Sequence, residues 1–437
     1  MDHEHVLGAY ADLAVQVGVG LRAGQRLLLR SPLTAAPLAR RIVAAAYRAG
    51  SPYVHVQWTD EEVTKARYLL APEGSFEEVP LGQAEALEAM AERGDALVSI
   101  SASDPEALAA ADPERVATGR AALQRALAPF TRHVMADRVP WTILAVPTPA
   151  WACKVFPDAS EETAVAKLWD AILTATRMDL ADPVAAWREH VATLEARAAR
   201  LDRRAYHALR FRGPGTDLVV GLADGHVWKG GASVTPTGQT FVPNLPTEEV
   251  FTAPHRERVD GTVRASLPLA YGGRLIEGFR LRFERGRVVE AHADRGQEVL
   301  DRLLDTDEGA RRLGEVALVS VDSPIHRSGL LFLNTLFDEN AASHLALGRA
   351  YRFCLAGGVE ADDETVAAAG LNESLVHVDF MIGSPEIDVD GVHADGASEP
   401  VMRDGRFVRL TGDRGPGPGP AGRRPSDGRR VAGIVAT

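Results

Sequence analysis

The chain has 437 residues, a formal net charge of −12, 46% hydrophobic residues and 25% charged residues. This composition is ordinary for a soluble globular protein, and the length suggests two domains. The negative charge and the lack of a long basic face argue against nucleic acid or an anionic membrane as a partner. The longest apolar runs have the length of a strand and are too short to span a bilayer.

The N-terminus and the cysteines indicate a cellular compartment. Residues 1–5 contain no basic region followed by an apolar run, so the sequence predicts no secretory signal. Cys153 and Cys354 lie far apart in the sequence and in no metal-binding spacing, as expected for reduced cysteines. We therefore expect a cytoplasmic protein.

The first half of the chain alternates between helical and strand patterns. Helices are predicted over residues 6–17, 38–49, 84–92, 105–127, from 160 onward and over 183–201. Strands are predicted over residues 25–30, 53–58, 96–101 and 141–146. This alternation predicts a largely parallel sheet covered by helices. His190, which follows an arginine and a glutamate, is expected to be solvated.

From residue 207 onward, short alternating runs are separated by glycine turns. Residues 279–283 alternate apolar and basic side chains, and Glu284–Arg287 turns the chain back into residues 288–291, which predicts a hairpin. Asp390-Gly391 and Asp404-Gly405 are predicted as further hairpin turns, since such turns need positive φ. The second half is therefore predicted to be rich in antiparallel strands.

The change of pattern predicts the domain organisation. We expect an α/β domain over residues 1–190 and an α+β domain over residues 191–410, with helices at 296–304 and from Asp338 onward. Residues 411–437 contain alternating glycine and proline and pairs of arginine, and they cannot bury a core. We expect this tail to be solvated and disordered rather than to bind an acidic partner.

Carboxylates and imidazoles, which borderline divalent metals prefer as ligands, are concentrated between residues 334 and 383. The candidates are Asp338, Glu339, His344, Tyr351, His377 and Asp379. In a strand, His377 and Asp379 would point to the same face, as two ligands of one site must. Two upstream segments place Glu248-Glu249 and Glu315 among apolar residues, where an unpaired charge is costly to bury.

Each of these residues also has a structural interpretation. Asp338 and Glu339 could favour the dipole of a helix that begins there, and His344 would then lie on a helical face with a core or surface role. Glu315 could be a solvated charge at the end of a strand, and Glu248-Glu249 could lie on a surface loop. Taken together, however, the carboxylates and histidines supply enough ligands for two divalent ions.

Four segments of the chain carry a specific resemblance. They are Asn244–Pro254 (NLPTEEVFTAP), Leu313–Val319 (LGEVALV), Asp338–Gly348 (DENAASHLALG) and His377–Gly383 (HVDFMIG). In this order they resemble the signature stretches of the thermophilic-type metalloaminopeptidases, the aminopeptidase T and aminopeptidase S group (peptidase family M29). The resemblance extends from the first predicted helix to about residue 410 and does not include the glycine-proline and arginine tail.

The resemblance implies a set of site residues. The implied metal ligands are Glu249, Glu315, Glu339, His344, His377 and Asp379. Glu315 would bridge two divalent ions, which would be zinc or cobalt, with manganese or magnesium as further options. Tyr351 matches the tyrosine of the family site and is predicted to donate a hydrogen bond to the developing oxyanion. Either Glu248 or Glu339 would act as the proton shuttle.

The resemblance also implies the activity, a metal-dependent aminopeptidase that removes N-terminal residues from short peptides through a metal-activated water. It implies a homodimer with an enclosed cavity. One alternative is a dinuclear metal hydrolase of another amide or ester, and another is a non-catalytic metal- or peptide-binding protein. A nucleotide-binding oxidoreductase is disfavoured because Gly18, Gly20 and Gly24 follow a helix and precede a strand, the reverse of a phosphate-binding loop.

Overall fold

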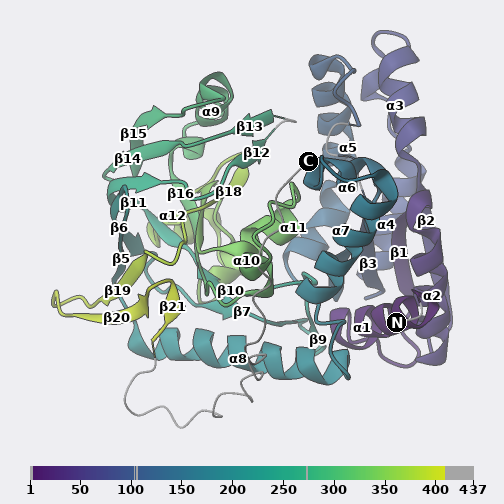
Figure 1. Ribbon diagram of the computed structural model, residues 1–437, viewed down its shortest axis with the longest axis horizontal. Helices are drawn as coiled ribbons and strands as arrows, with labels where there is room; N and C mark the ends of the chain where they lie inside the picture. Colours follow the sequence, from purple (N-terminus) through teal and green to yellow (C-terminus); the bar gives the residue numbers. More distant parts are fainter. Residues whose placement is uncertain (1–2, 103, 105–106, 272–273, 409–437) are drawn as a thin grey trace, which may run out of the picture. The chain divides into compact units, whose positions relative to one another are not determined.

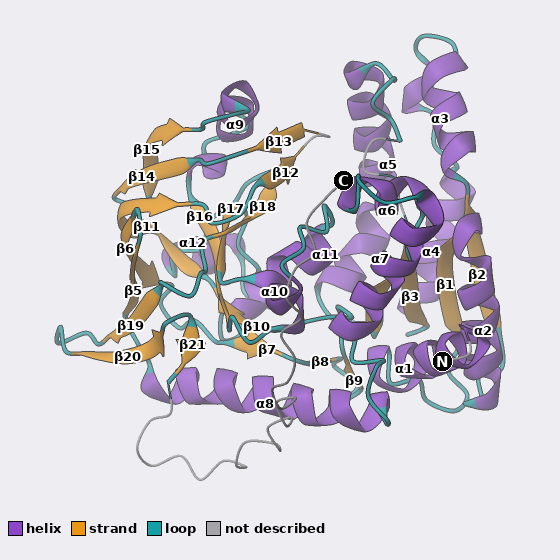
Figure 2. Cartoon of the chain, in the orientation of Figure 1, coloured by secondary structure: helices purple, strands orange, loops and turns teal. Residues whose placement is uncertain are grey.

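The computed structural model describes residues 3–102, 104, 107–271 and 274–408 (Figures 1 and 2). The described residues up to Phe407 form one compact unit. The predicted domain boundary near residue 190 falls inside helix α8 (Pro183–Arg204) and stays a prediction. The tail predicted over residues 411–437 lies outside the described residues.

A four-stranded parallel sheet organises the first part of the chain, with the strand order β2-β1-β3-β4. Its strands are β1 (Leu27–Pro32), β2 (Val54–Thr59), β3 (Ala96–Ser101) and β4 (Trp141–Ala145). The helices of this part, besides α8, are α1 (His3–Leu13), α2 (Ala36–Arg48), α3 (Glu61–Leu70), α4 (Leu81–Glu92), α5 (Pro113–Met135), α6 (Pro149–Val155) and α7 (Glu161–Ala175). A short π-helix, Ala14–Gly18, continues α1.

Buried side chains of this sheet alternate between two cores. Leu27 and Leu29 of β1 pack with residues of α1, α2 and α7, whereas Leu28 packs with Leu87 of α4 and Phe130 of α5. A parallel sheet that is covered on both faces shows this pattern. The prediction of a parallel sheet covered by helices is therefore confirmed. The sequence pattern did not predict α3 and α6.

The rest of the unit is rich in antiparallel strands, as predicted, and its two larger sheets are antiparallel. The eight-stranded sheet has the order β15-β14-β11-β6-β5-β19-β20-β21. Its strands are β5 (Ala208–Gly213), β6 (Thr216–Leu222), β11 (Pro254–Arg264), β14 (Arg280–Glu284), β15 (Arg287–His292), β19 (Asp388–Val392), β20 (Ser398–Arg403) and β21 (Arg406–Phe407). The predicted hairpin is the pair β14–β15.

The five-stranded sheet has the order β18-β17-β16-β10-β7. Its strands are β7 (Lys229–Gly230), β10 (Glu249–Thr252), β16 (Leu313–Val319), β17 (His344–Gly348) and β18 (His377–Met381). Helix α8 packs along β7 and β10 and reaches α1 (Figure 1). The remaining elements are β8 (Ser233–Val234), β9 (Thr240–Phe241), β12 (Leu269–Tyr271), β13 (Arg274–Ile276), α9 (Gln297–Leu304), α10 (Pro324–Ser328), α11 (Thr335–Asp338) and α12 (Asp363–Ala368).

The prediction of a helix that begins at Asp338 and extends through His344 is wrong, because Asp338 ends helix α11 and only a short 3-10 turn, Glu339–Ala341, follows. The side chain of Asn334 accepts the backbone N–H of Leu336 and so starts the helix four residues earlier. The carboxylate of Asp338 accepts the backbone N–H groups of Phe332 and Asn334, which holds the preceding loop. The chain then enters β17, so His344 lies on a strand and not on a helical face.

One of the two predicted aspartate-glycine turns is also wrong. Asp404-Gly405 turns the chain between β20 and β21, with positive φ at both residues, as predicted. Asp390-Gly391 instead lies within β19, paired with β5. A Cβ at Gly391 would come within 2.4 Å of the ring of Tyr206, so this glycine serves close packing and not a turn. No helix in the described part of the chain is long and apolar enough to cross a membrane.

Candidate metal centre

The candidate ligands lie on one face of the five-stranded sheet. Side chains along each strand alternate between the two faces. Val250, Leu318, Leu345 and Phe380 point into the core that this sheet shares with the eight-stranded sheet. The opposite face carries Glu249 of β10, Glu315 of β16, His344 of β17, and His377 and Asp379 of β18. The prediction that His377 and Asp379 lie on a strand and face the same way is confirmed.

The register of the strands brings these side chains together, with small residues between them. Ala346 of β17 is paired with Glu315 on one side and with Asp379 on the other. Ala317 of β16 is paired with His344. Because alanine carries only a methyl group, neither residue places a bulky side chain between the carboxylates and the imidazole.

Glu249, Glu315 and His344 form one buried group. The Nε2 atom of His344 is 3.0 Å from Oε2 of Glu249 and 3.4 Å from Oε1 of Glu315. One ligand atom from each residue lies within 4.8 Å of the other two. Two carboxylates and one imidazole at this separation are suited to hold a divalent cation.

Glu315 also belongs to a second group, with His377 and Asp379. Its other oxygen, Oε2, is 3.7 Å from Nε2 of His377, and that nitrogen is 3.4 Å from Oδ1 of Asp379. The two oxygens of Glu315 therefore face two different histidines. This is the arrangement expected of a carboxylate that bridges two cations.

Backbone carbonyl groups orient both imidazoles. The Nδ1 atom of His344 is 3.1 Å from the carbonyl oxygen of Ala342, and Nδ1 of His377 is 2.7 Å from that of Arg349. A proton on Nδ1, donated to the carbonyl, leaves the lone pair of Nε2 for a metal ion. Both histidines thus present Nε2 to the carboxylates.

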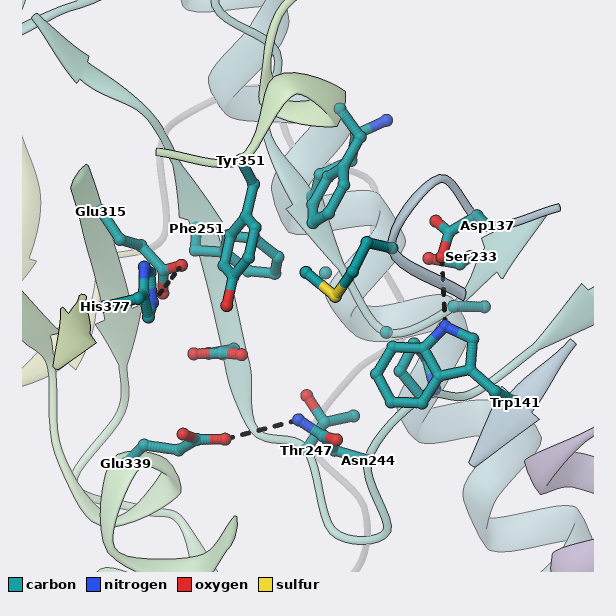
Figure 3. Close-up of a pocket in the computed structure, with 18 of the residues that line it drawn as sticks. Asp137, Trp141, Ser233, Asn244, Thr247, Phe251, Glu315, Glu339, Tyr351 and His377 are labelled. Carbon is teal, nitrogen blue, oxygen red and sulfur yellow. Dashed lines mark hydrogen bonds and ion pairs between the residues drawn. The ribbon is translucent and has the colours of Figure 1, made fainter. Parts of the chain in front are cut away.

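Glu339 approaches the same centre from the turn that follows α11 (Figure 3). Its Oε1 atom accepts hydrogen bonds from the side-chain amides of Asn244 and Asn340, both at 3.4 Å. Glu339 lies outside both three-residue groups but lines the cavity above them. The sequence interpretation did not single out Asn244 or Asn340, since nothing local to either residue indicates a contact with Glu339.

Tyr351 follows β17 and completes this side of the centre. Its ring stacks on Phe353 with 5.0 Å between ring centroids and lies 4.6 Å from the ring of His377. In Figure 3, the hydroxyl of Tyr351 points into the space between Glu315 and Glu339. Burial raises the pKa of Tyr351, and the charges of the surrounding carboxylates add to the shift, so the hydroxyl keeps its proton.

Burial and mutual repulsion perturb the carboxylates. Burial raises the pKa of Glu315 to about 7 against the hydrogen bond from His344, and the charge of Asp379 adds to the rise. Burial likewise raises the pKa of Glu339 well above its usual value, together with the charge of Glu249. Asp379 is the exception, because the hydrogen bond and charge of a neighbouring histidine lower its pKa despite burial. A positive charge is therefore needed for all these carboxylates to ionise together.

The donor set fits divalent cations. The buried Oε2 atom of Glu249 has no well-aligned hydrogen-bond donor among the described residues. With Glu315, Glu339 and Asp379, it makes four carboxylates, whose charge two divalent cations would balance while the histidines stay neutral. Carboxylate and imidazole ligands suit zinc, cobalt and manganese.

Glu248, unlike its neighbour Glu249, is held away from the centre. Nη1 of Arg177 is 2.6 Å from Oε1 of Glu248, and Nε2 of His190 is 3.6 Å from the other oxygen. Glu248 does not line the cavity. The prediction that His190 is solvated is wrong, since its ring packs edge-on against Trp187 and burial lowers its pKa to about 4.

A cavity of about 200 Å³ lies over the ligand-bearing face (Figure 3). The candidate ligands other than His344 line it, as do Asp137, Trp141 and Lys229. In Figure 3, Asp137 and Trp141 lie on the side opposite Glu315 and His377. Phe251 also lines the cavity and was not predicted as a site residue. It is two residues after Glu249 on β10, so the alternation of a strand would have placed it on the same face.

Comparison with known proteins identifies the family. The sequence profile of the thermophilic metalloprotease family (M29) matches residues 3–407. The chain belongs to this family. It is 50% identical over 405 residues to Aminopeptidase 2 of Geobacillus stearothermophilus, covering 93% of this chain and 98% of that protein. It is 51% identical over 398 residues to Aminopeptidase T of Thermus thermophilus, covering 91% and 97%.

The fold is also similar to that of a solved structure, wild-type AmpT from Thermus thermophilus. The TM-score is 0.88 at 50% sequence identity, and the similarity covers 93% of this chain and 100% of that one. The predicted family and the predicted enzyme class, a metallo-aminopeptidase that hydrolyses peptide bonds, are confirmed. Membership in this M29 family implies divalent metal ions, and the two groups described above are the candidate sites.

Proposed function

We propose that this metallo-aminopeptidase removes N-terminal residues from short peptides with two divalent cations that share Glu315. The observation that carries the proposal is the position of the two Glu315 oxygens, which face His344 and His377 respectively. We further propose that the α+β region, residues 191–410, is the domain that carries the metal site, because each of the candidate ligands lies within it.

Each residue has a defined role in this proposal. Glu249 and His344 would hold one cation, His377 and Asp379 the other, and Glu315 both. Glu339 is a further candidate ligand at the edge of the pair. Bound there, divalent cations supply a water of lowered pKa and polarise the scissile carbonyl. Zinc or cobalt is expected, with manganese or magnesium as alternatives, since all accept oxygen and nitrogen ligands.

Tyr351 is the proposed donor to the developing oxyanion. Its hydroxyl keeps its proton because burial raises its pKa, and stacking on Phe353 fixes the direction of the ring. A donor that is already oriented stabilises the transition state without reorganisation.

Glu339, rather than Glu248, is the proposed proton shuttle. It lines the cavity that lies over the two candidate metal groups, so its carboxylate faces any water or substrate that enters there. Glu248 is paired with Arg177 and does not line the cavity. A carboxylate that is engaged in a buried ion pair is a poor carrier of protons.

The size of the cavity supports short peptides as substrates. It is about 200 Å³, and the aromatic side chains of Trp141, Phe251 and Phe353 line its walls. A homodimer, a cytoplasmic location and the absence of nucleic-acid partners stay predictions.

The test is release of the N-terminal residue from a leucyl peptide by the full chain, before and after chelation. We expect activity to disappear with the chelator, to return with zinc or cobalt, and to track a content of two metal ions per chain. An N-acetylated peptide serves as the control, since an aminopeptidase needs the free amine. Equal hydrolysis of the acetylated peptide would favour a broader amide hydrolase, and full activity without metal would refute the proposal.

A further inference from the structure

The cavity contains a lysine that the proposed mechanism does not use. Lys229 on β7 is paired with Phe251 of β10, so its side chain lies on the face of the sheet that carries Glu249. Among the described residues that line the cavity, Lys229 is the one lysine or arginine. It is half-buried, and its charge acts on Asp137, which lies across the cavity from His377 in Figure 3.

The ammonium group of Lys229 forms no salt bridge with a carboxylate in the described part of the chain. Asp137 is the carboxylate at this end of the cavity, and it feels the charge of Lys229. However, Asp137 already accepts hydrogen bonds from Nε1 of Trp141, at 3.3 Å, and from Ser233, and burial raises its pKa. Lys229 is therefore left to interact with a group that enters the cavity.

The surroundings of Lys229 are open but fixed. The next three residues, Gly230, Gly231 and Ala232, add no side chain larger than a methyl group to the cavity wall. A Cβ at Gly230 would come within 2.9 Å of the carbonyl oxygen of Glu249, so glycine allows β7 to lie close to β10. On the other side, the backbone N–H of Trp228 donates to the carboxylate of Asp202 on α8, at 2.8 Å.

The distance from Lys229 to the candidate metal centre suits a peptide. Lys229 and Glu249 are diagonal neighbours on paired strands, and such residues lie roughly 7–8 Å apart, with their Cβ atoms somewhat closer. An extended peptide advances by about 3.3–3.6 Å per residue. A carboxylate one or two residues beyond the scissile bond, or at the end of a long N-terminal side chain, would come within reach of the ammonium group.

We propose that Lys229 binds a carboxylate of the substrate and makes the enzyme selective for peptides that carry one close to the scissile bond. This inference rests on the proposed aminopeptidase function and specifies its substrate class. The carboxylate has two chemical sources, the C-terminus of a di- or tripeptide and the acidic side chain of the N-terminal residue.

The test compares wild type, Lys229→Met and Lys229→Arg in the metal-loaded full chain with matched substrates. Leucylglycine against leucylglycinamide tests the C-terminal carboxylate, and glutamylglycinamide against glutaminylglycinamide tests the side chain. Methionine keeps an unbranched apolar side chain without the charge, and Lys65→Met is the control because Lys65 lies outside the cavity. Thermal unfolding of each variant establishes that it folds.

We expect wild type to prefer the carboxylate member of one pair in kcat/KM by about 10- to 100-fold, the value of one charge-assisted hydrogen bond. Lys229→Met should abolish that preference, Lys229→Arg should keep most of it, and Lys65→Met should leave it unchanged. The pair that shows the preference identifies the source of the carboxylate. A Lys229→Met variant that keeps the wild-type ratio, or that lowers all four rates equally, would overturn the proposal.

Calorimetry separates this inference from the proposed function. Leucylglycine with a reduced peptide bond cannot be cleaved, and its binding is compared with that of its C-terminal amide; the glutamyl and glutaminyl analogues are treated in the same way. If no substrate is hydrolysed but a carboxylate preference in binding is lost in Lys229→Met, the proposed function fails and the role of Lys229 stands. If wild type shows no carboxylate preference in rate or in binding, the role of Lys229 is refuted.

Discussion

Replacement of Glu315 by glutamine should have opposite effects on the metal-free and the metal-loaded protein. Glutamine keeps the size and one carbonyl oxygen of the side chain but removes its charge. In the loaded protein, the change removes the carboxylate common to the two candidate metal groups. In the metal-free protein, it removes a charge that burial and the neighbouring carboxylates disfavour.

The magnitude follows from the pKa of Glu315, which rises from 4.5 to about 7 in the metal-free fold. A raised carboxyl pKa means that the native state binds the proton more tightly than the unfolded state. The cost of the charge is therefore absent below pH 4.5 and fully present above about pH 7. A shift of this size corresponds to about 3 kcal/mol. Metal-free Glu315→Gln should exceed metal-free wild type in stability by about that amount at pH 8, and by little at pH 4.

Urea unfolding of both metal-free proteins at the two pH values measures this difference, with the exposed Glu85→Gln as a control. In the loaded protein, metal content should fall below two per chain. Turnover should fall by more than about 100-fold, because replacing residues that merely hydrogen-bond to a metal ligand typically costs up to about 100-fold. A metal-free variant less stable than wild type at pH 8 would refute the electrostatic argument, and retention of two metals with normal turnover would refute the shared ligand.

Three further predictions follow from the same geometry. Tyr351→Phe should lower kcat by about 10²–10³-fold with unchanged metal content, because the ring still stacks on Phe353 while the oxyanion donor is lost; wild-type kcat would exclude that role. Glu339→Gln should reduce turnover with little loss of stability, whereas Glu248→Ala should lower the free energy of unfolding by about 3–5 kcal/mol because it leaves Arg177 buried without its partner. Kinetics and urea unfolding of the two variants test this contrast, and the reverse pattern would indicate that Glu248 is the proton shuttle. Chelation should lower the melting temperature, and added metal at about 100 times its Kd should raise the free energy of unfolding again by about 2.7 kcal/mol. A melting temperature that is insensitive to metal would argue against a metal site in the native fold.

Local sequence patterns predicted those elements of the site whose structure is determined by the same local alternation of apolar and polar residues. The apolar residues that flank His377 and Asp379 indicated a strand, and the two-residue alternation then placed both side chains on one face. The parallel sheet was predictable for the same reason, since its strands are apolar runs between helical segments. Helix α3 also has a local signal, Asp60 as N-cap followed by two glutamates. Most of this helix is exposed, however, so its sequence lacks the periodic apolar residues by which a buried helix is recognised.

Features that depend on distant residues could not be predicted. Gly391 is required by the ring of Tyr206, which lies about 185 positions earlier in the sequence. The separation of Glu248 from Glu249 depends on Arg177, which lies about seventy positions earlier in the sequence. The role proposed for Lys229 depends on the pairing of β7 with β10, and no local pattern marks that pairing.

The small side chain of Ala346, between Glu315 and Asp379, is one determinant of how the site can bind metal. A bulkier side chain at this position would extend between the two carboxylates, while every ligand atom and the net charge of the site would stay the same. The affinity of such a site for metal can therefore change through a residue that donates no ligand atom.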